Sequence, residues 1–367
     1  MSTDVVLAGV MLAALVIYSL LGGADYGAGF WDLMCSGPRR QDQRDLIARA
    51  IQPVWETNHI WLILVVVLTF AGFPIAFSWI SLSLAVPIFL ILLGVVLRGS
   101  SYVFRAYFTG SVHTQLYWGK VFSVSSSITP LFLGIVIGAI SSGGVLVKDG
   151  VSENGFLGTW FHPFPLIVGV LSLSLFAYLS ACYLTIETND AALQNDFRKR
   201  ALISGFVSIA AATLTYVIAG DSAKPIRDGL SRVPYVWMIE LGAAIAALVA
   251  FQALWSRSYL RARIAAAAQV ALIVSGWGVA QYPYLVRPEL TIANGAAPAN
   301  ILSDLEVAVA VGAVVLIPSL ILLLLVFKTH RKSISVVGDT TLVQSSEPAE
   351  NSYANARSNF TIITKRT

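Results

Sequence analysis

The feature that most constrains this chain is a series of long apolar stretches separated by mostly short polar segments. A helix of about 20 apolar residues crosses a hydrocarbon core about 30 Å thick, and each stretch is close to that length. We therefore expect an all-α, polytopic membrane protein with nine transmembrane helices. The predicted helices are about Val5–Gly22, Ile60–Phe77, Trp79–Leu97, Val121–Ile140, Phe164–Thr185, Ala201–Ala219, Val233–Leu254, Ile264–Tyr284 and Leu305–Phe327.

Composition excludes the other broad classes of protein. Hydrophobic residues form 56% of the 367 residues and charged residues only 12%, which is about half the charged share of a typical soluble domain. So few charges cannot cover the surface of a soluble fold of this length. A disordered chain would need low hydrophobicity and high charge.

The basic residues predict how the helices are oriented. Of the 24 Lys and Arg residues, 19 fall in the odd-numbered loops and the C-terminal segment, and five fall in the even-numbered loops. Cytoplasmic loops carry the excess of Lys and Arg in membrane proteins. We therefore expect the N-terminus outside and the C-terminus inside. A transmembrane domain of residues 1–328 would then be followed by a mobile polar cytoplasmic tail, residues 329–367.

Three acidic residues lie in or beside the predicted spans: Asp25 ends the first, Glu56 opens the second and Glu240 lies within the seventh. A carboxylate is costly in a bilayer, so such residues are functional candidates. Asp25 and Glu56 share the predicted cytoplasmic edge, where two acids could open a proton path. Alternatively, they cap helices or pair with first-loop arginines. Glu240 could face a cavity, pair with a neighbour or bind a lipid head group.

The glycines near Asp25 allow two interpretations. Gly27 and Gly29 resemble half of a phosphate-binding loop, but no strand precedes them and no Lys-Ser or Lys-Thr follows at the required spacing. Close helix packing or a tight turn is the better interpretation. Gly22 and Gly23 are interpreted in the same way as these two.

Histidines bear on the question of cofactors. The chain has four, His59, His113, His162 and His330, and only His59 lies at the start of a predicted span. A membrane di-haem protein needs paired axial ligands, commonly His. We therefore expect this chain to bind no haem through its own axial ligands and no metal ion. A hydrogen-bonded interfacial position is expected for His59, with single haem ligation as the rarer alternative.

Two neighbouring segments carry a family resemblance. The pattern G-x-D-x-G-x-G is formed by Gly23, Asp25, Gly27 and Gly29, and Trp31-Asp32-Leu33 follows it. The pattern P-x-W-[DE]-x-N-x-[VI]-W-L-I is formed by Pro53, Trp55, Glu56, Asn58, Ile60, Trp61, Leu62 and Ile63. In combination these segments resemble subunit II of the cytochrome bd-type quinol oxidases, including the cyanide-insensitive branch, and the likeness extends over about residues 5–330.

The resemblance implies a function for the whole complex. Such enzymes oxidise quinol and reduce O₂ to water in bacterial inner membranes. Subunit I carries two b-type haems, one d-type haem and the quinol site, and subunit II binds no haem through axial ligands. No catalytic residue and no nucleic-acid partner are then expected for this chain. Small single-helix accessory subunits, and a structural quinone or lipid in this chain, stay open.

The resemblance also assigns roles to residues. Asp25 and Glu56 match acids of a hydrophilic path that brings protons toward the haem site of subunit I. Many members have Asp where this chain has Glu56, so the side chain here is longer by one methylene group. Asn58 and His59 belong to the same motif as Glu56. Trp55 and Trp61 flank it, where they are expected to anchor at the interface or to shield a cofactor or partner.

Two other interpretations follow from the residues. A secondary transporter would favour inverted repeats and paired broken helices, and no such repeat is visible in the sequence. A pure assembly scaffold would use the same acids only structurally.

Overall fold

The computed structural model describes residues 2–51, 57–107, 112–232 and 234–344. The chain forms two compact units, Met1–Val309 and Ala310–Thr367. The helices of the described residues are α1 (Thr3–Leu33), α2 (Arg40–Ile51), α3 (His59–Gly72), α4 (Pro74–Ser83), α5 (Ala85–Tyr107), α6 (Val112–Ser142), α7 (Gly155–Gly158), α8 (Pro163–Leu184), α9 (Ala191–Ser222), α10 (Lys224–Arg232), α11 (Pro234–Trp255), α12 (Tyr259–Gln281), α13 (Ile292–Gly295) and α14 (Ala299–Gln344). Two short antiparallel hairpins pair β1 (Val147–Lys148) with β2 (Val151–Ser152), and β3 (Tyr284–Val286) with β4 (Leu290–Thr291).

The expected all-α membrane architecture is confirmed. Within the described ranges, eight helices are long and apolar enough to cross a membrane: α1, α5, α6, α8, α9, α11, α12 and α14. The pair α3 and α4 passes the same test together, and counting it as one span gives nine. Helix α14 runs through residue 328 without a break, and residues 345–367 of the expected tail lie outside the described residues.

The second and third predicted spans have different bounds in the structure. Helices α3 and α4 meet at a bend of 113°, where Phe73 leaves the helical conformation and Pro74 starts the next helix. Proline favours the first position of a helix because it lacks the N–H that an interior position needs. The predicted span Ile60–Phe77 is therefore wrong at its end, and the third span begins at Ala85 rather than Trp79.

The first predicted span is too short. Helix α1 continues past Gly22 to Leu33, so Asp25 lies inside the helix rather than at its end. The glycines do not stop the helix because they serve close packing. A Cβ at Gly27 would overlap the carbonyl oxygen of Phe176 in α8, and one at Gly29 would overlap the side chain of Ser126 in α6. The packing interpretation of these glycines is confirmed, as it is at Gly23, where a Cβ would lie 2.6 Å from the Phe176 ring.

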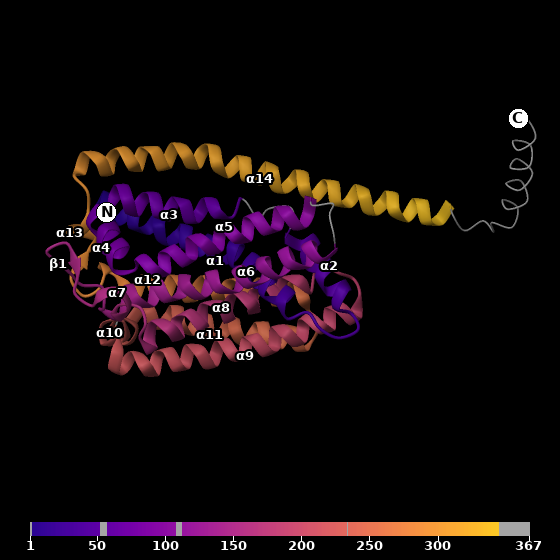
Figure 1. Cartoon of the computed structure of the whole chain (residues 1–367), viewed down its shortest axis with the longest axis horizontal. Helices are drawn as coiled ribbons and strands as arrows, with labels where there is room; N and C mark the ends of the chain where they lie inside the picture. The colour runs from indigo at the N-terminus through magenta and orange to yellow at the C-terminus, as the bar shows by residue number, and fades with distance from the viewer. Residues whose placement is uncertain (1, 52–56, 108–111, 233, 345–367) are drawn as a thin grey trace, which may run out of the picture. The chain divides into compact units, whose positions relative to one another are not determined.

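Helix α1 is central within the first unit. It packs against α3, α6, α8 and α12, and α5 packs against α6. Figure 1 shows α2 at one end of the bundle and α4, α7, α10 and α13 at the other. Because α1 begins at the α13 end and α5 follows α4, both helices run toward the end that carries α2.

Candidate functional site

The two motif segments meet at Asp25. Asn58 lies immediately before α3, is buried, and donates a hydrogen bond from Nδ2 to Asp25 Oδ2 at 2.5 Å. This contact spans 33 positions of the chain, and it places the acid of the first motif beside the amide of the second. Trp55 and Glu56 belong to residues 52–56, which lie outside the described residues.

Arg98 supplies the positive charge of this site. Arg98 lies in α5 and is only 1% exposed. The positive charge of its guanidinium acts on the Asp25 carboxylate. The guanidinium carbon lies 4.8 Å from the centroid of the Tyr26 ring, and Nε donates to Ser126 Oγ at 3.2 Å. A buried arginine needs such partners because its desolvation is costly.

Arg98 comes directly after the predicted span Trp79–Leu97, so the sequence placed it in a loop and not among the site residues. That assignment is wrong because α5 continues to Tyr107. The apolar residues that follow Arg98, among them Val103 and Phe104, are the signal that could have placed this arginine within a helix.

A cluster of aromatic rings adjoins Arg98 through Tyr26. The hydroxyl of Tyr18 donates to the hydroxyl of Tyr26 at 3.3 Å, and the His59 ring lies 6.2 Å and 6.1 Å from these two rings. Trp61 packs against the same cluster. His59 Nδ1 is buried and has no hydrogen-bond partner among the described residues, so the expected hydrogen bond of this histidine is not found there.

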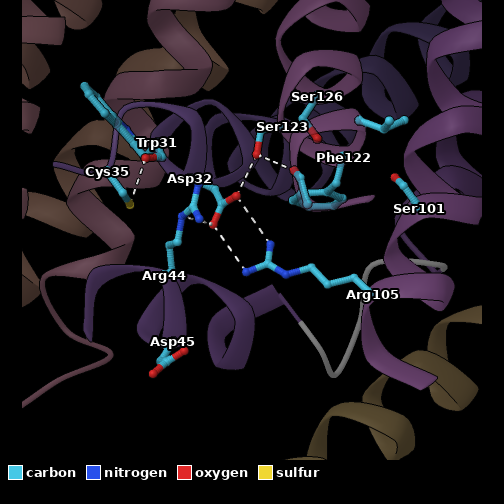
Figure 2. A network of polar contacts seen from close by, with 12 residues as sticks. Trp31, Asp32, Cys35, Arg44, Asp45, Ser101, Arg105, Phe122, Ser123 and Ser126 are labelled. Atoms are coloured by element: carbon cyan, nitrogen blue, oxygen red, sulfur yellow. Dashed lines mark hydrogen bonds and ion pairs between the residues drawn. The ribbon is translucent and has the colours of Figure 1, made fainter. Parts of the chain in front are cut away.

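A second acid of α1 forms a denser network toward the α2 end (Figure 2). Asp32 is fully buried. Its Oδ2 accepts a hydrogen bond from Ser123 Oγ at 2.6 Å, and Arg105 contacts both carboxylate oxygens, at 3.3 Å and 3.5 Å. Arg44 Nε lies 3.8 Å from Oδ1. The network therefore joins α1, α2, α5 and α6 through one carboxylate.

Glu240 differs from both acids of α1. It lies in α11 on an exposed stretch with Trp237, Met238 and Leu241. Within the described part of the chain it has no hydrogen bond or ion pair, so the paired role left open by the sequence is not found there.

The described residues contain no group of three or more His, Cys, Asp and Glu side chains that could hold a metal ion. Cys35 and Cys182 are both free and buried. Burial raises the pKa of the Cys35 thiol, which lies just beyond the end of α1. A thiol with a raised pKa forms little thiolate at neutral pH and reacts slowly.

Comparison with known proteins identifies the family. A sequence model described as "Cytochrome bd terminal oxidase subunit II" matches residues 3–327. The chain belongs to this family. It is therefore a subunit of a bd-type quinol oxidase, a respiratory oxidoreductase of bacterial membranes, and this membership decides against the transporter interpretation.

Individual relatives of this subunit II agree with that assignment. It is 25% identical over 312 residues to the putative cytochrome bd menaquinol oxidase subunit II of Bacillus subtilis, covering 80% of this chain and 87% of the relative. It is 23% identical over 311 residues to the cytochrome bd-I ubiquinol oxidase subunit 2 of Escherichia coli, covering 76% and 80%. The bd oxidase structure of Geobacillus thermodenitrificans matches with a TM-score of 0.74 and 26% identity, covering 89% of this chain and 99% of that chain.

Proposed function

We propose that this chain is the non-haem subunit II of a cytochrome bd-type quinol:O₂ oxidoreductase, and that it brings protons from the cytoplasm toward a haem-bearing subunit I. The observation that supports the proton path is the buried polar cluster around Asp25. Its carboxylate accepts a hydrogen bond from the Asn58 amide at the start of α3, and the buried Arg98 of α5 lies over the ring of Tyr26, the next residue of α1. Polar groups gathered at this depth are costly, so they point to a function.

The chemistry of the complex explains why such a cluster is useful. Haems of the partner would supply electrons to O₂, and reduction of O₂ to water consumes protons. A bilayer interior offers no protons without a polar route. Asp25 accepts the Asn58 hydrogen bond at Oδ2, so its other oxygen keeps lone pairs that can take up a proton. Tyr18 and Tyr26 add two hydroxyl groups that are hydrogen-bonded to each other on the same helix.

We propose that the α2 end of the bundle faces the cytoplasm. Helix α2 and the residues before it carry Arg39, Arg40, Arg44 and Arg49, and positive residues concentrate in cytoplasmic loops. In the chain, Glu56 lies between α2 and Asn58, and this sequence position is the reason for including it with Asp25 in the proposed path. The cofactors stay on the partner in this proposal, because His59 is enclosed by tyrosine rings and lacks a paired histidine on its own helix.

Neutral isosteric variants test the path. Asp25→Asn and Glu56→Gln each keep shape and hydrogen bonding but remove the titrating proton. We expect both to assemble with parental haem content, and turnover to fall by about a hundredfold to ten-thousandfold, the range for a lost proton-transfer group. The KM for quinol should not change, and Glu56→Asp should recover part of the rate.

Two results would argue against this function. A collapse of the haem absorbance in both neutral variants would make the acids structural and favour the scaffold interpretation. Parental turnover at full haem content would mean that protons reach the oxygen site by another route.

A further inference from the structure

We propose that Asp32 and Arg105 are positioning residues, which set the register in which Arg98 faces Asp25. The proposal rests on the proposed function, since it concerns the same path. It adds to that path an ion pair that itself lies nearer to the α2 end of the bundle (Figure 2).

The spacing of the charged residues is the first observation that supports a fixed register of α1 and α5. Asp25 and Asp32 are seven residues apart in α1, and Arg98 and Arg105 are seven residues apart in α5. Seven residues make about two helical turns and about 10 Å of rise, so each pair shares a face of its helix. Because α1 and α5 run in the same direction, the relative position of the two helices that forms the Asp32–Arg105 ion pair also places Arg98 over the ring of Tyr26, the residue next to Asp25. Sliding α5 by one turn would break the ion pair and remove Arg98 from Tyr26 and Ser126 together.

Helix α6 connects the two pairs. Ser126 accepts a hydrogen bond from Arg98, and Ser123, three residues earlier, donates one to Asp32. Gly29 lies between Asp25 and Asp32 on α1 and lets α6 approach, because any side chain there would overlap Ser126. Both serines are buried. Helix α6 therefore connects Asp32 with Arg98 through these two serines, in addition to the matching spacing on α1 and α5.

The contacts of the two acids separate their roles. Asp32 receives Arg105 on both oxygens and Ser123 on Oδ2, with Arg44 nearby. Its lone pairs are therefore engaged in fixing four helices. Asp25 accepts one hydrogen bond, at Oδ2, within the described part of the chain. The geometry assigns proton transfer to Asp25 and the holding of register to Asp32.

A double-mutant cycle in the whole complex tests this assignment. The variants are Asp32→Asn, Asp25→Asn and the two combined, with turnover, quinol KM and haem content measured for each. Misplacing a reacting group by about 1 Å can cost about a hundredfold, so we expect Asp32→Asn to lower turnover by about tenfold or more at unchanged KM. On the Asp25→Asn background we expect no further loss, because Asp32 acts through Asp25. Asp32→Glu should recover part of the rate.

The matched control is Asp45→Asn, the same change at an exposed carboxylate of α2 that points away from Asp32 (Figure 2). It should leave turnover at the parental value. If Asp32→Asn does not assemble, Asp32→Asn/Arg105→Gln, which removes both charges, replaces it in the cycle with the same expectation.

Three results would overturn the inference. Losses that multiply in the combined variant would show that Asp32 acts independently of Asp25, which leaves the proton path itself intact. Parental turnover in Asp32→Asn would show that the pair is dispensable. Failure of both Asp32 variants to assemble would make it a folding requirement. Parental turnover in Asp25→Asn alone would instead reject the proposed function.

Discussion

Helices α1 and α11 are both apolar and both carry acidic residues, but the surroundings of these acids are opposite. Asp25 and Asp32 of α1 meet amide, guanidinium and hydroxyl groups from α5, α6 and the start of α3. Glu240 of α11 lies on an exposed stretch among large apolar side chains. The sequence singles out Asp25 and Glu240 alike as acids in or beside a predicted span and does not single out Asp32, and only the neighbours of each acid tell them apart.

The difference follows from where each helix lies in the bundle. Helix α1 packs against four long helices, so its polar side chains are surrounded by partners, whereas α11 packs mainly against α12. An acid in a central helix can form hydrogen bonds and ion pairs with several elements at once, and these offset the free energy that its burial costs. The comparison teaches that depth in an apolar helix alone does not identify a functional carboxylate.

The largest effect on stability is expected at Gly27, where α1 packs closely against α8. In Gly27→Ala the new Cβ would overlap backbone atoms of Phe176, which cannot rotate away as a side chain can. We expect a loss of stability of about 3 kcal/mol or more, seen as loss of the assembled complex or a lower thermal midpoint. In α11, Gly242→Ala places its Cβ 3.4 Å from Leu272 Cδ1, and this control should be close to neutral. Equal effects at both glycines would contradict the comparison.

A smaller loss of stability is expected when the arginines around Asp32 are replaced, and it should differ between the two. Arg105 contacts both carboxylate oxygens directly, whereas Arg44 Nε is 3.8 Å from one. Arg105→Gln should therefore destabilise the complex by about 3 kcal/mol, as removing one partner of a buried ion pair does. Arg44→Gln should cost clearly less. Thermal unfolding followed by haem absorbance would show the order, and the reverse order would reject the network as described.

The smallest effect is expected at Glu240. Because it has no hydrogen bond or ion pair within the described residues, Glu240→Gln should leave assembly, haem content and turnover within about twofold of the parental complex, as surface changes usually do. A tenfold loss of turnover would show that this acid faces a partner, and would remove the distinction between the two helices.

Much of the fold was predictable because apolar length and the excess of basic residues in alternate loops are one-dimensional signals. The bend between Gly72 and Pro74 was not predicted, because a continuous apolar run conceals a break inside it. The extension of α1 to Leu33 was missed since glycines that normally end helices here serve close packing.

The candidate site was predicted only in part. The motifs contain Asp25 and Asn58, and the structure adds the hydrogen bond between them, which the sequence did not predict. Arg98, Arg105 and Ser123 lie on other helices, and no spacing within the motifs points to them. The exposure of Glu240 could not be predicted either, because α11 is apolar on every side and has no polar face to orient it.

The most direct test of the account is proton uptake measured on the side of the α2 end during O₂ reduction. Complexes carrying Asp25→Asn or Glu240→Gln would be reconstituted in vesicles, with a pH indicator in the compartment that the α2 end faces. We expect proton uptake to be slowed by about tenfold or more in Asp25→Asn and to be unchanged in Glu240→Gln, at equal haem content. Parental uptake in Asp25→Asn, or an equal loss in both variants, would contradict this expectation.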